Sequence, residues 1–156
     1  MIKALFFFLL LIPCNMLAQS DSIIVTGKFS TDLLQSEWFQ QWNNSSVNYQ
    51  PDAATMEQLA TIPTAELQVI VYLGTWCDDS KLHVPAFLNI AHKMELDFVL
   101  IGVNREKECP FEKKECKNWD IQNVPTFVVK RNDVEIGRII ETPAQSIEKD
   151  LLKLLK

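Results

Sequence analysis

The residue of this chain best suited to chemistry is Cys77, which lies in the segment Trp76-Cys77-Asp78-Asp79-Ser80. An apolar run precedes the segment and a helical pattern follows it, so Cys77 is expected at a helix N-terminus. Backbone N–H groups and the helix dipole stabilise a thiolate there. The Asp78 and Asp79 carboxylates oppose a further negative charge, whereas the Ser80 hydroxyl, one turn on, is placed to donate a hydrogen bond to the sulfur. The pattern indicates a moderately activated nucleophile; the alternative is a small buried side chain, the commoner fate of a free cysteine.

The remaining cysteines are Cys14, Cys109 and Cys116. Loss of Cys14 with a leader would leave three cysteines, so at least one thiol would stay outside any intramolecular pair. In one straight helix the Cα atoms of Cys109 and Cys116 would lie about 10.5 Å apart, too far for a disulfide. Pro110 indicates, however, that a helix begins after Cys109. A disulfide between these two, two unpaired thiols, and a role in resolving an adduct on Cys77 all remain open.

Charge and spacing argue against several other classes of site. The formal net charge is −5 at pH 7, and no Lys/Arg cluster with interleaved aromatic residues occurs, so nucleic-acid binding is not expected. His83 and His92 lack cysteine partners at the spacing of zinc ligands. We expect both to be ordinary helix residues, and we expect no metal site and no cofactor.

The first 19 residues have the pattern of a signal peptide. Lys3 precedes the apolar run Ala4–Ile12, which Pro13 ends. The run is about half of the roughly 20 residues that a membrane-spanning helix needs, so no stable membrane span is expected. Cleavage after Ala18 or Gln19 would place the protein in the periplasm or outside the cell. A lipoprotein attached through Cys14 is less favoured, because proline stands where such a signal has a small residue.

The rest of the chain is expected to form a helical extension over residues 20–63 and one α/β domain over residues 64–156. Continuous runs rich in Val and Ile predict buried strands, and apolar residues at helical spacing predict the helices. A parallel crossover followed by an antiparallel hairpin makes a mixed sheet, and ligands bind such sheets at the carboxyl ends of strands, where Cys77 falls. The predicted strands cover residues 67–73, 98–103, 126–130 and 134–140, and the predicted helices cover residues 32–42, 52–62, 79–94, 110–119 and 144–155.

Residues 67–155 resemble the thioredoxin superfamily in three features that occur in the right order. These are Trp76-Cys77, Pro85 eight residues further on, and Val124-Pro125-Thr126. The resemblance implies a thioredoxin-like fold, in which helices flank a central mixed sheet and an N-terminal helical extension is added. It also implies that a cis peptide bond before Pro125 turns this loop toward the sulfur, so that Trp76, Val124, Pro125 and Thr126 bind an extended substrate. Protein or small-molecule thiols and disulfides are the implied partners.

From about Thr31 onward, the chain is similar to bacterial thioredoxin-family proteins that carry Gly-Thr-Trp-Cys-x-Asp-Ser, and its Ala-Gln leader end resembles those common in Bacteroidetes. Two positions depart from the superfamily: Ser80 replaces the second, resolving cysteine, and Val71 replaces a buried acid that assists resolution. The predicted function is therefore an exported monothiol thiol-disulfide oxidoreductase that acts through mixed disulfides at Cys77. The alternatives are a non-enzymatic peptide-binding module with an incidental Cys77 and, ranked last, peroxide chemistry at Cys77.

Overall fold

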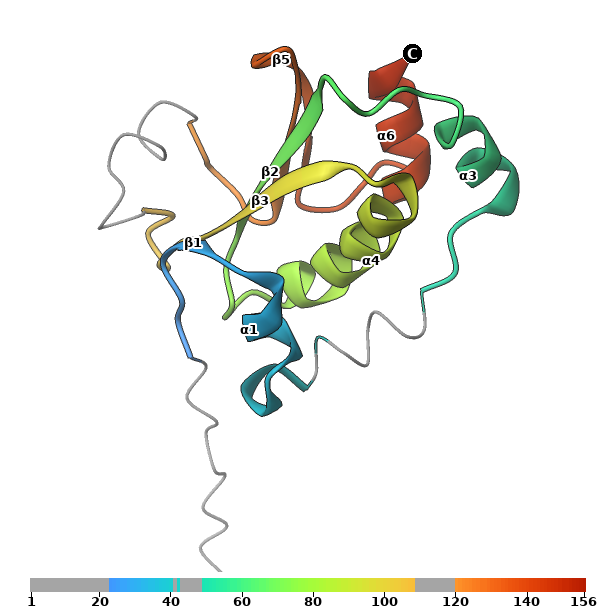
Figure 1. The fold of residues 1–156 in the computed structure, drawn as a ribbon. Helices are drawn as coiled ribbons and strands as arrows, with labels where there is room; N and C mark the ends of the chain where they lie inside the picture. The colour runs from blue at the N-terminus through green and yellow to red at the C-terminus, as the bar shows by residue number, and fades with distance from the viewer. Residues whose placement is uncertain (1–22, 41, 43–48, 109–119) are drawn as a thin grey trace, which may run out of the picture.

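The computed structural model describes residues 23–40, 42, 49–108 and 120–156 (Figure 1). The predicted signal peptide, the predicted helix over residues 110–119, and Cys14, Cys109 and Cys116 lie outside the described residues. Within them, no helix is both long and apolar enough to cross a membrane.

A five-stranded mixed sheet forms the centre of the described structure, in the order β1-β3-β2-β4-β5. The central strand β2 pairs in parallel with β3 and antiparallel with β4, while β1 and β5 join antiparallel at the two edges. This arrangement confirms the predicted fold class. The strands are β1 (Gly27–Phe29), β2 (Leu67–Leu73), β3 (Asp97–Gly102), β4 (Thr126–Arg131) and β5 (Val134–Ile140).

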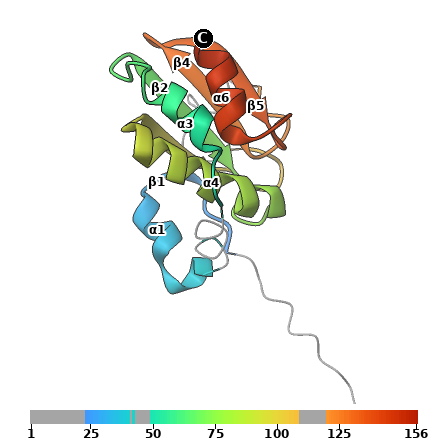
Figure 2. The same cartoon turned by 90° about the vertical axis from the view of Figure 1, so that its right-hand side faces the viewer.

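The helices α4 (Asp78–Met94) and α6 (Ile147–Leu155) lie against one face of this sheet, and α3 (Ala53–Leu59) packs beside α6 (Figures 1 and 2). Between them and the strands lies the main core, whose fully buried members include Val69, Phe87, Phe127 and Leu151. A smaller apolar cluster on β2, β3 and β4 is centred on the buried Tyr72. Burial on both faces explains why the central strands read as continuous apolar runs.

The N-terminal extension is only partly helical. A short helix, α1 (Thr31–Gln35), begins at the cap Ser30, whose side chain accepts a hydrogen bond from Asp32 N–H at 3.1 Å, and a single 3-10 turn, η1 (Glu37–Phe39), follows it. The strand β1 precedes both, and no pattern in the sequence predicts it. Three residues that begin with glycine are too few to show the period-two alternation that marks a strand.

Other boundaries differ from expectation by a few residues. The helix α6 begins at Ile147 instead of residue 144, because the Asp150 carboxylate accepts a hydrogen bond from Ala144 N–H at 2.6 Å and holds a loop before the helix. The helix α3 ends at Leu59 instead of residue 62. The turn between β4 and β5 uses positive φ at Asn132 and Asp133, 49° and 64°, conformations that these two residue types tolerate well.

Candidate active site

Cys77 lies at the end of the turn that connects the central strand β2 to α4, the longest described helix. It is the N-cap of α4, with φ −92° and ψ 128°. Its N–H donates to the Gly74 carbonyl at 2.9 Å, and its own carbonyl accepts from Lys81 N–H at 3.1 Å. The thiol is free and half-buried. The predicted position at the carboxyl end of β2 is therefore the position found.

The loop before β4 lies directly against the sulfur. The Val124–Pro125 peptide bond is cis, and Cys77 Sγ donates to the Val124 carbonyl oxygen at 3.2 Å. Thr126, the first residue of β4, pairs with Tyr72 of β2 and donates its hydroxyl to the Asn123 carbonyl at 2.7 Å. Antiparallel pairing of β4 with β2 thus brings Cys77, Val124 and Pro125 together from positions almost 50 residues apart.

The hydrogen bond predicted from Ser80 to the sulfur is replaced by two others. The Ser80 hydroxyl oxygen accepts from Gly74 N–H at 3.2 Å, while Cys77 Sγ points to Val124. Ser80 is fully buried. Its side chain therefore fixes the turn between β2 and α4 and supports Cys77 through the backbone.

Trp76 shields the other side of the turn. Its indole Nε1 donates to the Val103 carbonyl at 3.1 Å, and the Arg105 guanidinium lies 5.1 Å from the ring centroid, within range of a cation–π contact. A Cβ atom on Gly74 would lie 2.8 Å from Trp76 Cε2, so the turn requires glycine there. Nothing in the spacing of the sequence indicates that Arg105 reaches this ring.

Thr75 connects the site to the N-terminal segment. Its hydroxyl donates to the Ile23 carbonyl at 2.5 Å and accepts from Val25 N–H at 3.1 Å. The Thr75 side chain is 2 % exposed. This contact spans about 50 residues and has no signal in the sequence.

The charges on the first turns of α4 are partly compensated. Asp78 forms an ion pair with Lys81 at 2.8 Å, and a hydrogen bond and charge from Lys81 lower the pKa of the Asp78 carboxyl. Burial lowers the pKa of His83, against the opposing charge of Asp79. No group of three or more His, Cys, Asp or Glu side chains in the described residues is arranged to hold a metal ion.

The buried acid that is typical of thioredoxins has no counterpart at position 71. Val71 is fully buried in β2 and pairs with Leu100 on one side and Phe127 on the other. An apolar side chain there can neither accept nor donate a proton. The second half of a dithiol reaction thus lacks both its usual thiol and its usual acid at these positions.

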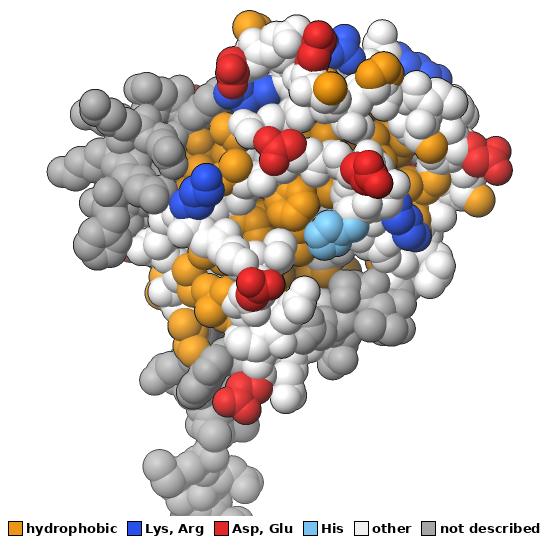
Figure 3. Space-filling view, in the orientation of Figure 1, with side chains coloured by type: hydrophobic (Ala, Val, Ile, Leu, Met, Phe, Trp, Pro, Cys, Tyr) orange, Lys and Arg blue, Asp and Glu red, His pale blue; other side chains and the backbone are white. Residues whose placement is uncertain are grey.

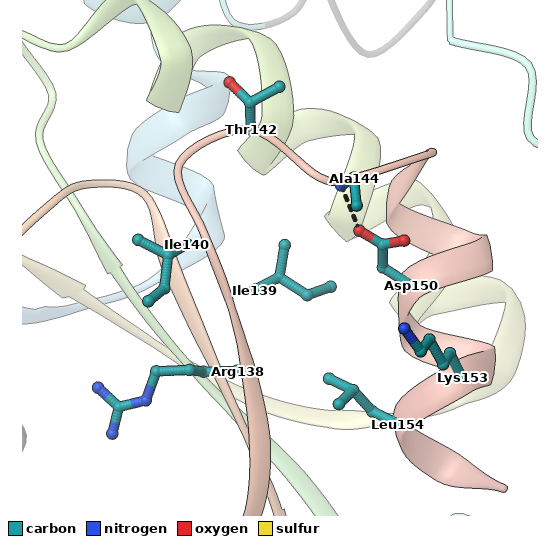
Figure 4. Close-up of a pocket in the computed structure, with 8 residues that line it drawn as sticks. All are labelled: Arg138, Ile139, Ile140, Thr142, Ala144, Asp150, Lys153 and Leu154. Atoms are coloured by element: carbon teal, nitrogen blue, oxygen red, sulfur yellow. Dashed lines mark hydrogen bonds between the residues drawn. The ribbon is translucent and has the colours of Figure 1, made fainter.

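A separate shallow cavity of about 250 Å³ lies between β5 and α6 (Figure 4). It is lined by Arg138, Ile139, Ile140, Thr142, Ala144, Asp150, Lys153 and Leu154. The Asp150 carboxylate is already engaged by Ala144 N–H. None of the predicted site residues lines this cavity, so it is distinct from the Cys77 site.

Comparison with solved structures supports the fold. A Pseudomonas aeruginosa protein of unknown function matches with a TM-score of 0.50 and 18% identity, over 70% of this chain and 64% of that one. The crystal structure of an HIV epitope-scaffold matches with a TM-score of 0.54 and 15% identity, over 84% and 83%.

Sequence comparisons point the same way. Thioredoxin H2-1 of rice (Oryza sativa subsp. japonica) is 27% identical over 128 residues, which are 80% of this chain and 88% of that protein. Thioredoxin H2 of Arabidopsis thaliana is 32% identical over 90 residues, 57% and 63% of the two chains. The family model for thioredoxin matches residues 48–153, about two thirds of the sequence, which include Cys77, Ser80 and residues 124–126. The chain belongs to the thioredoxin family.

Proposed function

We propose that this protein is an exported monothiol thiol-disulfide oxidoreductase that acts through mixed disulfides at Cys77. The observation that carries the proposal is the juxtaposition at the end of β2. The N-cap residue of α4, Cys77, carries a free, half-buried thiol that faces the Val124 carbonyl beside Pro125, while the position one turn on holds a buried serine. Membership of the thioredoxin family supports thiol-disulfide chemistry in general.

The proposed reaction follows from the presence of one thiol, that of Cys77, on this turn. The Cys77 thiolate attacks one sulfur of a client disulfide, a bond forms between Cys77 and that sulfur, and the other client sulfur leaves as a thiolate. A second thiolate must then attack the mixed disulfide and take over the client, which restores the Cys77 thiolate. The Ser80 hydroxyl cannot perform this attack. We infer that a second thiol from outside this chain, on the client, a small molecule or another protein, completes the exchange.

The loop at Pro125 gives the client a place to lie. The carbonyl of Val124 is 3.2 Å from the sulfur, so a client cysteine bound to Cys77 would have this backbone beside it. Trp76 is held on the other flank by its bond to Val103. Trp76, Val124, Pro125 and Thr126 are the proposed client-binding residues.

Export is proposed from the sequence pattern of residues 1–19, in which a lysine precedes a short apolar run. An oxidising compartment supplies the disulfides on which such a site acts. Mass spectrometry of the N-terminus of the protein from cells tests this part. A mature chain that begins near Ser20 supports export, and a chain that retains residues 1–19 in the cytoplasm contradicts it.

The central experiment measures how fast each thiol reacts with an alkylating probe and whether Cys77 captures a client. Cys77 should react fastest, and a model peptide disulfide should become attached to it until a small thiol is added. A Cys77→Ser variant should capture no peptide, while Cys109→Ser and Cys116→Ser should retain capture. Equal reactivity of all three thiols would contradict the proposal, and client binding that survives Cys77→Ser would favour the peptide-binding module.

A further inference from the structure

We propose that the segment Ile23–Thr26, called here the N-terminal strap, is a wall of the client site that selects clients with an apolar side chain about three residues from the reacting cysteine. The inference rests on the proposed function, because it concerns which disulfides reach Cys77. It arises from the direction of β1, the hydrogen bonds of Thr75 and two exposed isoleucines.

The direction of β1 brings the strap to the end of the sheet at which Cys77 lies. Gly27 pairs with Gly102, the last residue of β3, and Gly102 pairs in turn with Leu73, the last residue of β2. Because β1 runs antiparallel to β3, the residues before Gly27 continue past the carboxyl end of β3, and Cys77 follows the carboxyl end of β2. A parallel β1 would carry these residues to the opposite end of the sheet.

Two close contacts fix the strap in this position. Thr75 stands two residues before Cys77. Its hydroxyl forms hydrogen bonds with both the Ile23 carbonyl and the Val25 N–H. A Cβ atom on Gly102 would lie 2.3 Å from the Val25 carbonyl oxygen, so the strap passes too close to β3 for any residue but glycine. The strap is thus tied to the same turn that carries the thiol.

The outer surface of the strap is apolar. Ile23 and Ile24 are each 44 % exposed, and Figure 3 shows hydrophobic side chains, in orange, gathered at the lower left of the molecule. The strap lies beside the turn that carries the thiol, because its contact residue Thr75 stands two residues before Cys77. An exposed isoleucine pair beside a peptide-capturing thiol fits an apolar side chain of the captured peptide.

The contact at Thr75 sets the distance at which that side chain must lie. The Ile23 carbonyl accepts from the Thr75 hydroxyl, and Thr75 precedes Cys77 by two residues, a span of at most about 7 Å. The strap therefore lies on the order of 10 Å from the thiol, which an extended peptide covers in about three residues. A client that lies across the edge therefore brings the third residue from its cysteine over Ile23 and Ile24.

Cysteine peptides activated as mixed disulfides with an aromatic thiol test the proposal. Attack by the Cys77 thiolate joins Cys77 to the peptide sulfur and releases the aromatic thiolate, whose colour reports the rate. Peptides carry leucine or serine three residues before or after the cysteine. Rates are corrected with the Cys77→Ser variant, and the symmetrical aromatic disulfide, which has no peptide, measures the thiol alone.

In one of the two positions, before or after the cysteine, the leucine peptide should react about fivefold to tenfold faster than the matching serine peptide. Partial burial of a leucine side chain allows a preference of this size. The double variant Ile23→Ser/Ile24→Ser should lose this preference and keep its rate with the symmetrical disulfide. Val134→Ser is the matched control, since Val134 is 66 % exposed at the opposite edge of the sheet, and it should keep the preference.

An unchanged leucine preference in the double variant, or no preference in the parent protein, would overturn the strap proposal while leaving Cys77 reactive. Failure of the symmetrical disulfide to react at Cys77 would instead overturn the proposed function. Sedimentation measurements of the oligomeric state test whether a second copy of the chain binds the strap instead of a client. The proposal would also be overturned if the parent protein is a dimer, the double variant is a monomer, and the peptide preference is the same in both.

Discussion

At the scale of single residues, Ser80 lies one helical turn from Cys77, is fully buried and accepts a hydrogen bond from Gly74 N–H. A cysteine there would carry a second thiol one helical turn from the first, with a sulfur larger than the serine oxygen that it replaces. Its burial keeps it away from large clients and leaves Cys77 as the thiol that meets them. Under the proposed function, serine here leaves this turn without a second thiol to finish the exchange.

Replacing this serine is expected to convert the chemistry. Ser80→Cys should release a captured peptide from Cys77 without an added thiol, with formation of an internal disulfide between positions 77 and 80. The measurement is the rate of peptide release after capture, followed by mass spectrometry. We expect an increase of at least about tenfold, because an intramolecular thiol acts at a high effective concentration.

Ser80→Ala is the matched control for this conversion. It removes the hydroxyl acceptor, leaves Gly74 N–H without its partner and should lower the free energy of unfolding by about 1–3 kcal/mol. Peptide release should not accelerate. If release from the parent protein is already fast without any added thiol, another thiol of the chain resolves the adduct and the monothiol proposal fails.

Much of the site was predictable at this scale, because Trp76, Cys77 and Pro125 belong to contiguous motifs. The contacts of Thr75 and Arg105 were not. Each depends on where a distant backbone segment passes, and a side chain carries no sequence signal for a partner about 50 or 30 positions away. Ser80 lies on the expected turn, but its hydroxyl accepts from Gly74 N–H, a backbone partner that residue spacing does not reveal.

At the scale of elements, α4 carries the thiol at its first turn and a partly buried histidine in its second. Burial lowers the pKa of His83 below 6.5, although the charge of Asp79 acts in the opposite direction. The unfolded chain therefore binds this proton at a higher pH than the folded chain does. As the pH falls from about 6.5 toward the folded value, protonation favours the unfolded state and stability declines.

A His83→Gln variant should remove this part of the pH dependence. Urea unfolding measured at several values on either side of pH 6.5 should show a smaller loss of stability in mild acid than in the parent protein. His92→Gln, in the last turn of the same helix, controls for the loss of a histidine from the helix. An identical acid response in His83→Gln and the parent would contradict the assignment.

The elements themselves were largely predictable, since β2, α4 and β4 are long, buried and strongly periodic. The strand β1 was not, because its pairing depends on the free edge of β3 and not on its own three residues. Boundaries moved where a side chain capped the backbone, as Asp150 does before α6. Such local hydrogen bonds compete with helix formation and are weakly visible in residue patterns.

At the scale of the whole molecule, a buried carboxylate ties the N-terminal extension to the last helix. Glu148 of α6 is 3 % exposed; it accepts from the Tyr49 hydroxyl and from Asp52 N–H, the latter at 3.1 Å. Burial acts to raise the pKa of the Glu148 carboxyl, but these hydrogen bonds outweigh it and lower the pKa below 4.5. Burial and the neighbouring carboxylate raise the pKa of the Tyr49 hydroxyl well above its usual range.

Tyr49→Phe should destabilise the protein by about 1–3 kcal/mol, because it leaves a buried charged acceptor with one partner fewer. The Glu148 contribution is complete above pH 4.5 and is lost as the pH falls through the lowered folded value. The difference between parent and variant should therefore be largest near neutral pH and shrink in acid. Denaturant unfolding measures both.

A double-mutant cycle with Glu148→Gln checks that the two side chains act together. The combined loss should be smaller than the sum of the single losses, since each single change breaks the same bond. Additive losses would show that the two residues stabilise the protein independently.

The antiparallel β1 also decides how the protein should be handled in the laboratory. Ile23 lies at the end of the sheet that holds Cys77, whereas Leu155 lies beside Arg131, which pairs with Leu67 at the start of β2, at the opposite end. An affinity tag, fluorescent reporter or surface anchor joined upstream of the strap would crowd the thiol. The same addition after Lys156 would leave the thiol facing freely into solution.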